Sequence, residues 1–350
     1  MIPAMETPLT IADTAILPGE THEIRIKLSE SHGSIPVYMP VTVIRGVQPG
    51  PTVFFTAAVH GDEINGVEIV RTLTQRLSPE QLRGTVVNVP IVNVLGFNNH
   101  ERCLPDGRDL NRTFPGSATG SQTSRIAHLI YHEVIRHCQF GIDFHTAAHG
   151  RHNMPHIRAN VEDEETLRLA RAFGARVILH GQGRRGSLRR EAARGCVPTI
   201  VFEAGEAGRF ERSAVTHGVN GACNVLHELR MLDWQPVSPI YQVIARTGEW
   251  IRAPRGGILS AAIDLGDLVY KGQDIGVISN PYGRELTSVR APFTGIVVGL
   301  TVSPLMNPGS PICHMVKVER ALEEVEKALA LESTVTEGGS RKERKPPRRS

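Results

Sequence analysis

The stretch that decides the fold reads TVFFTAAVHGDE and spans residues 52–63. Its first eight residues form a continuous apolar run, which is typical of a β-strand covered on both faces. The run ends in His60 and Glu63, two side chains that can bind a metal ion and that lie three residues apart. We expect Gly61 to provide a tight turn between them. The sequence therefore predicts a buried strand with a reactive loop at its carboxyl end.

Strand and helix patterns alternate outward from this stretch. The alternation predicts an α/β fold with a mixed, mostly parallel sheet flanked by helices. Residues 20–46 also alternate in polarity and predict an antiparallel hairpin. The expected strands are 85–92, 141–144, 176–179 and 198–202, and the expected helices are 65–77, 122–137, 162–173 and 215–231.

The region after the proline-bearing linker at residues 233–239 has a different pattern. Ala253-Pro254 returns as Ala291-Pro292, and similar strand patterns surround both pairs. Such a repeat predicts a small β-sandwich or barrel with two similar halves. We therefore expect a catalytic domain over 1–235, a C-terminal β domain over 236–320, and a short helix with a disordered basic tail over 321–350.

Charge and cysteine content exclude several classes of protein. The formal charge is +3, but the last ten residues hold six Lys/Arg and one Glu, so the remainder has 33 basic and 35 acidic residues. This balance argues against a nucleic-acid surface on the folded part. Five widely spaced cysteines argue against a disulfide framework. Neither a signal-peptide pattern nor an 18-residue apolar run occurs, so we expect a soluble cytoplasmic protein without a membrane partner.

His60 and Glu63 can point at the same ion, because one turn separates them. Zinc accepts imidazole nitrogen and carboxylate oxygen, and a catalytic zinc site uses three protein ligands and an open position. The third ligand should come from another strand end, and His145 follows the apolar segment 140–144. Carboxyl ends of parallel strands meet at one edge of a sheet. The sequence therefore predicts one Zn²⁺ per chain on these three residues.

Glu203 ends another apolar strand, and a carboxylate in that place is costly unless it is paired or functional. As a general base and acid, it would deprotonate a metal-bound water and pass the proton to a leaving amine. An ion pair of Glu203 with Arg189, Arg190 or Arg194 is the alternative.

The RDLNR loop at residues 108–112 is rich in groups that bind anions. Arginine presents a planar fork that holds a carboxylate in two places. We expect Arg108, Asn111 and Arg112 to bind substrate and Arg102 to polarise the scissile carbonyl. Asp109 would hydrogen-bond the free nitrogen of a zinc histidine. A salt-bridged surface loop is the alternative.

Two further patterns are interpreted as non-functional. His149, His152 and His156 have a spacing that suggests a second metal site, but we expect them to line a pocket or lie on the surface. The glycines of the GQGRRG segment at 181–186 match a dinucleotide fingerprint. We reject that site because two arginines fill the gap between the glycines and the segment sits deep in the domain.

Four motifs together resemble the succinylglutamate desuccinylase/aspartoacylase family. They are HGDE at 60–63, DGRDLNR at 106–112, DFHTAA at 143–148 and FEAG at 202–205. The resemblance spans roughly residues 20–318, including the C-terminal β domain. It implies the zinc carboxypeptidase-like fold and zinc-dependent hydrolysis of an amide, such as an N-acyl amino acid, with the zinc ligands and Glu203 as given above. It also implies substrate roles for Arg102, Asn111 and Arg112, and it makes Arg189 a substrate-side arginine by position.

Two alternatives remain open. The first is a zinc carboxypeptidase acting on peptides, which an added domain near the cleft disfavours. The second is a carrier module of the biotinyl/lipoyl type, although the hairpin tip at 279–285 has no lysine to modify. The expected partner is a small N-acyl amino acid and not a nucleic acid. The acyl group, the amino acid and a homo-oligomeric state are left open.

Overall fold

The computed structural model describes residues 9–318 and 321–339, with side chains described to residue 332. The predicted basic tail at 341–350 therefore lies outside the described residues. Within the described ranges, the helices are too short or too polar to cross a membrane.

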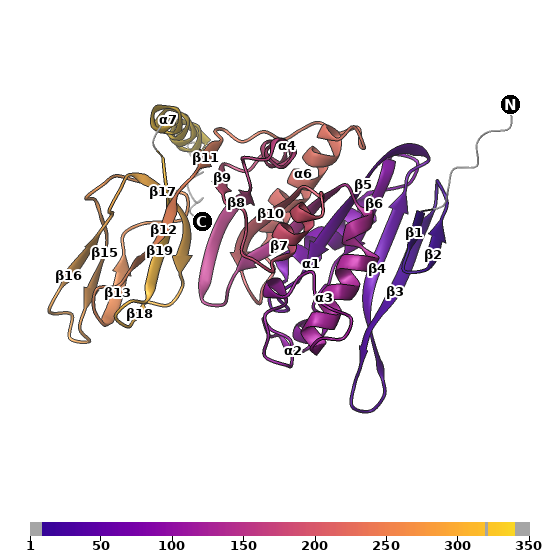
Figure 1. Ribbon diagram of the computed structural model, residues 1–350. Coiled ribbons are helices and arrows are strands. Elements are labelled where there is room, and N and C mark those ends of the chain that lie inside the picture. The colour runs from indigo at the N-terminus through magenta and orange to yellow at the C-terminus, as the bar shows by residue number, and fades with distance from the viewer. Residues whose placement is uncertain (1–8, 319–320, 340–350) are drawn as a thin grey trace, which may run out of the picture.

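One sheet of thirteen strands organises the molecule, and ten of the strands follow the order β12-β19-β17-β8-β10-β7-β5-β6-β4-β3 (Figure 1). The neighbours β6, β5, β7 and β10 are parallel, whereas β3, β4, β8 and β17 pair antiparallel with their neighbours in this order. The predicted mixed α/β fold is confirmed. The bounds are β3 Thr21–Glu30, β4 Pro36–Arg45, β5 Gln48–Ala57, β6 Arg83–Val89, β7 Phe140–Ala147, β8 Arg151–Ala159, β10 Thr199–Glu206, β12 Gly248–Arg252, β17 Gly295–Thr301 and β19 Pro311–Lys317.

Helices cover both faces of the parallel strands, which explains the continuous apolar run of β5. Phe54 packs in a core with Ile126 and residues near it, whereas Phe55 packs in the opposite core with Ile69 and Phe144. Both phenylalanines are fully buried. The helices are α1 Asn65–Arg76, α2 Val94–Asn99, α3 Gln122–Glu133, α4 Glu164–Phe173, α5 Leu188–Arg194, α6 Arg212–Glu228 and α7 Leu322–Gly339, with short 3₁₀ turns η1 Leu110–Arg112 and η2 Ile135–His137.

The structure differs from the predicted elements at several places, and the helix expected at 122–137 ends at Glu133. The strand expected at 85–92 ends at Val89. Asn93 then begins α2, since its side chain accepts a hydrogen bond from Gly96 N. The predictions omitted β8, whose polar residues and Pro155 hide the strand pattern. They also omitted α2 and α5, which are only six and seven residues long.

The C-terminal strands continue the main sheet. β12, β17 and β19 join its edge through the pairing of β17 with β8, while a separate sheet of order β16-β15-β13-β18 packs against them (Figure 1). Strands from both sides of residue 235 belong to the main sheet. The expected domain limits at 235 and 320 remain predictions. The remaining strands are β1 Leu9–Ile11, β2 Thr14–Ile16, β9 Val177–His180, β11 Val243–Ala245, β13 Gly257–Ala261, β14 Leu268–Val269, β15 Asp274–Ser279, β16 Thr287–Arg290 and β18 Leu305–Met306.

Candidate active site

The loop between β5 and α1 is held by two close backbone approaches. A Cβ on Gly61 would lie 2.1 Å from the carbonyl carbon of Gly96, so the loop packs directly on α2. The expected tight turn is present, since Glu63 N donates a hydrogen bond to His60 O at 3.1 Å. Gly61 has no positive φ, so the close contact with α2 is what requires a glycine there. A Cβ on Gly66 would lie 2.7 Å from Cβ of Phe144, so α1 packs tightly on β7. These contacts bring Glu63 beside His145.

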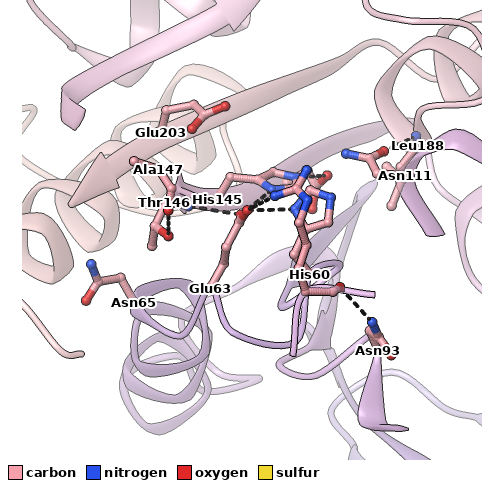
Figure 2. Close-up of polar contacts among 12 residues, drawn as sticks. His60, Glu63, Asn65, Asn93, Asn111, His145, Thr146, Ala147, Leu188 and Glu203 are labelled. Carbon is pink, nitrogen blue, oxygen red and sulfur yellow. Dashed lines mark hydrogen bonds and ion pairs between the residues drawn. The ribbon is translucent and has the colours of Figure 1, made fainter. Parts of the chain in front are cut away.

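His60, Glu63 and His145 converge on one point, as Figure 2 shows. Their ligand atoms lie within 4.8 Å of one another, and all three side chains are buried. Glu63 Oε1 lies 2.7 Å from His60 Nδ1, and Glu63 Oε2 lies 2.7 Å from His145 Nδ1. Despite its short distance to Glu63, the buried Nδ1 of His60 has no contact of hydrogen-bond geometry among the described residues. An imidazole nitrogen without a well-aligned hydrogen bond, beside a carboxylate and a second imidazole, fits a zinc ion.

A carboxylate holds the far nitrogen of each histidine. Asp109 Oδ1 lies 3.1 Å from His60 Nε2, and Asp143 Oδ2 lies 2.8 Å from His145 Nε2. Each contact leaves Nδ1 directed at the shared point, an arrangement common around metal-binding histidines. Asp109 was predicted in this place. Asp143 was not, although its position two residues before His145 on β7 puts both side chains on the same face.

These charges shift one another strongly. Burial would raise the pKa of Glu63, but His60 and His145 hold that pKa well below its usual range. Burial would lower the pKa of His145, yet Asp143 and Glu63 raise it well above its usual range. The carboxylate of Glu63 lies between two imidazoles, and each imidazole contacts one further carboxylate. Once both histidines lose their protons, these groups together carry a strong negative charge. Such a set favours a divalent cation.

Glu203 lies on β10 directly opposite His145 on β7 and faces the same side of the sheet (Figure 2). Its Oε1 forms an ion pair with Nε of Arg158 at 3.1 Å, and its Oε2 accepts a hydrogen bond from Nδ2 of Asn153 at 3.0 Å. The predicted alternative named Arg189, Arg190 or Arg194 as the ionic partner and was wrong. The partner comes from β8, the strand that the sequence pattern hid.

A cavity of about 380 Å³ opens beside this cluster. The three candidate ligands and Glu203 line it, and so does Trp250 from β12 of the C-terminal region. Arginines dominate the remaining polar wall. They are Arg102, Arg112, Arg151, Arg158, Arg184 and Arg189.

The predicted substrate residues do not all reach the cavity. Arg102 lines it, with Nη1 at 2.8 Å from Glu63 Oε1 and Nη2 at 3.4 Å from Asp109 Oδ2. Asn111 and Arg112 also line it, whereas Arg108 is exposed and lies outside the lining. Oδ1 of Asn111 accepts a hydrogen bond from the backbone N of Leu188 at 2.8 Å, which joins the RDLNR loop to α5.

Arg189 lies on α5 and reaches the cavity. Its Nη1 is buried and has no hydrogen-bond partner within the described part of the chain. Burial and the nearby Arg158 lower the pKa of Arg189 to about 10, so the guanidinium stays charged at neutral pH. In the described ranges, neither Arg189 nor Arg184 has an acidic group within ion-pair distance. Arg184 and Arg189 therefore bring positive charge to the cavity wall without a carboxylate of the described residues in ion-pair contact, whereas Arg102 and Arg158 are paired with Glu63 and Glu203.

The three further histidines form no second metal cluster within the described residues. His149 is exposed, His152 Nε2 lies 2.8 Å from Glu211 Oε2, and His156 is fully buried. None of them lines the cavity beside Glu203.

Comparison with known proteins gives the family. The catalytic-domain model of the succinylglutamate desuccinylase/aspartoacylase family matches residues 49–229. The chain is 26% identical over 303 residues to the N-alpha-acetyl-L-2,4-diaminobutyric acid deacetylase of Halomonas elongata, covering 82% of this chain and 87% of the relative. A crystal structure of a succinylglutamate desuccinylase/aspartoacylase from Rhodobacter sphaeroides is 26% identical, with a TM-score of 0.77 over 86% of this chain and 95% of that one. The product-bound ectoine utilization protein EutE of Ruegeria pomeroyi is 22% identical and shares the fold, with a TM-score of 0.75 over 85% and 95% of the two chains. This chain belongs to the succinylglutamate desuccinylase/aspartoacylase family.

Proposed function

We propose that the protein is a zinc-dependent amidohydrolase that removes the acyl group from an N-acyl amino acid or a similar small carboxylate-bearing amide. One observation supports this most directly. His60, Glu63 and His145 converge beside Glu203 at the wall of an arginine-lined cavity. The likeness to a deacetylase of an N-acetyl amino acid supports the same class of substrate.

In this proposal His60, Glu63 and His145 hold one zinc ion per chain. Zinc in such a site lowers the pKa of a water molecule and polarises a carbonyl group. Glu203 removes the proton from the attacking water and delivers it to the leaving amine nitrogen. The guanidinium of Arg102 stabilises the negative charge that develops on the carbonyl oxygen.

The remaining lining residues hold the substrate carboxylate. Arg112 and Arg189 present charged N–H groups to the cavity, and a carboxylate would give the orphaned Nη1 of Arg189 a partner. Because Oδ1 of Asn111 is already engaged with Leu188, its Nδ2 is the group that can donate to substrate. Arg108, which lies outside the cavity lining, has no part in this proposal.

The size of the cavity favours a small amide over a peptide. A volume of about 380 Å³ lies toward the small end of ligand pockets, which span roughly 300–1,000 Å³. Trp250 of the C-terminal region forms part of the wall and limits the space for a longer chain. A carboxypeptidase remains the second candidate.

The test is a substrate panel applied to wild type and to Glu203→Gln. The panel comprises N-acetyl-L-aspartate, N-succinyl-L-glutamate, Nα-acetyl-L-2,4-diaminobutyrate and short peptides. We expect turnover of at least one acyl amino acid, and a fall in kcat of roughly 10²–10⁴-fold in Glu203→Gln with zinc retained. Glu206→Gln, at the end of the same strand but outside the cavity lining, is the control. Faster cleavage of peptides would favour the carboxypeptidase, and unchanged kcat in Glu203→Gln would contradict the proposed base.

A further inference from the structure

We propose that the C-terminal β region is part of the catalytic apparatus, because its strand β17 holds Asn153 where the Asn153 amide positions the carboxylate of Glu203. Asn153 is thus a positioning residue rather than a catalytic one. The inference rests on the proposed function, in which Glu203 moves the proton.

Each carboxylate oxygen of Glu203 has a partner on β8. Asn153 Nδ2 donates to one carboxylate oxygen at 3.0 Å, and Arg158 Nε pairs with the other at 3.1 Å. Both partners come from β8, so a single strand fixes both oxygens. A glutamate side chain has several rotatable bonds, and contacts at both oxygens restrict it to one orientation. That orientation directs the base toward the side of the sheet where His145 lies.

An irregularity in β8 brings Asn153 to the face of the sheet on which Glu203 lies. Glu203 lies opposite His156, but Gly205 lies opposite Asn153, so β8 contains one extra residue in this interval. Strict alternation from His156 would put Met154 on the face of Glu203. The extra residue shifts the alternation and brings Asn153 to that face instead, as β-bulges do.

β17 of the C-terminal region contacts Asn153 from the other side of β8. Gly299 lies directly opposite Asn153 in the β17–β8 pair. A Cβ on Gly299 would lie 2.9 Å from Oδ1 of Asn153 and 3.5 Å from Cη2 of Trp250. β17 also shifts register against β19 between Val297 and Gly299. The absence of a side chain at Gly299 therefore leaves room for the Asn153 amide, which is nearly buried with 6% of the residue exposed.

The closing experiment measures kcat and KM on the panel substrate with the highest kcat/KM. Asn153→Ala removes a hydrogen bond to a charged group, so kcat should fall about 10- to 100-fold while KM and zinc content stay within about twofold. Asn153→Asp should lower kcat further, because a second carboxylate would face Glu203. A purely structural role for Asn153 predicts the opposite order, since Asp is the closer match in shape.

The contribution of β17 is isolated by Gly299→Ala. We expect kcat to fall in this variant, but no further fall when it is combined with Asn153→Ala, because both changes act through the same amide. Gly256→Ala is the control in the same region, since its Cβ would meet no atom closer than 3.5 Å. The inference would be overturned if Gly299→Ala lowered kcat equally in the wild-type and the Asn153→Ala backgrounds. It would also be overturned if Gly299→Ala left kcat unchanged.

A crystal structure of Gly299→Ala gives a readout independent of turnover. The separation of Asn153 Nδ2 and Glu203 Oε2 should exceed about 3.5 Å, the limit of a hydrogen bond, and an unchanged contact would contradict the proposed coupling. Glu203→Gln separates the two levels of the proposal. If it keeps wild-type kcat, the proposed base is wrong. If it is inactive while the Asn153 variants are not impaired, only the positioning role fails.

Discussion

Asp143→Asn should weaken zinc binding while leaving the fold nearly intact. Asp143 is fully buried and accepts two hydrogen bonds of 2.8 Å, from Thr56 Oγ1 and from His145 Nε2. Asparagine keeps the shape and one acceptor for His145, and the Thr56 hydroxyl can turn to accept from the new amide. The substitution therefore removes mainly the negative charge that orients and strengthens the imidazole ligand.

Loss of such a carboxylate raises the Kd of a metal site about 10- to 100-fold, which corresponds to about 1.4–2.7 kcal/mol. We expect Asp143→Asn near the upper end of this range, because Asp143 is fully buried. Asp109→Asn should lie near the lower end, since the Asp109 side chain is 21% exposed and its contact with His60 is longer, at 3.1 Å.

The assay is a competition titration with a chromophoric zinc chelator at pH 8, where fewer protons compete for the imidazoles. Urea unfolding of the same samples reports on the fold. A Kd for Asp143→Asn within twofold of wild type would refute the argument that this carboxylate fixes His145 as a ligand.

Three further changes test the packing, the buried histidines and the cavity. Gly66→Ala should lower the free energy of unfolding by about 1–3 kcal/mol, because its Cβ would press on Phe144, whereas Gly181→Ala, which meets open space, should stay within about 0.5 kcal/mol of wild type; urea unfolding measures both. The pKa of His156 is lowered to about 3 by burial and by Arg158, so the unfolded chain binds a proton that the folded one does not as pH falls below about 6.5. The free energy of unfolding should therefore decrease with falling pH. In His156→Gln the slope of this free energy against pH should be smaller by up to about 1.4 kcal/mol per pH unit. An unchanged slope in urea unfolding series from pH 7 to 4 would count against a role for His156. Arg189→Met should raise KM for carboxylate-bearing substrates about tenfold or more. It should not lower the free energy of unfolding, because the buried Nη1 has no hydrogen bond to lose. A destabilised variant with a normal KM would contradict this expectation.

Strong periodic signals predicted the fold well. The apolar run of β5 identified a strand buried on both faces, and Phe54 and Phe55 do pack in opposite cores. The ends of β5, β7 and β10 could then be placed at one edge, which brought His60, His145 and Glu203 together. Each of these residues follows or ends an apolar run, so local pattern was sufficient.

The missed parts depend on contacts that leave no local pattern. β8 contains Pro155, a bulge and mostly polar residues, so its register against β10 and β17 emerges only in the folded sheet. For that reason Arg158 and Asn153 were not found as partners of Glu203. The approach of Trp250 to the cavity likewise requires the C-terminal strands to join the same sheet. Asp143 is different, since its spacing from His145 on one strand was visible.

Zinc content of the purified chain, before and after reconstitution, is the measurement that decides whether the protein is a metalloenzyme. Elemental analysis of wild type and His145→Ala, with circular dichroism to confirm that both are folded, would decide whether the buried cluster of His60, Glu63 and His145 is a metal site. The account predicts one zinc ion per wild-type chain and far less in His145→Ala, with amide hydrolysis lost on chelation and restored by zinc. A folded wild-type chain that binds no zinc on reconstitution, or a His145→Ala variant that binds it equally well, would contradict the account.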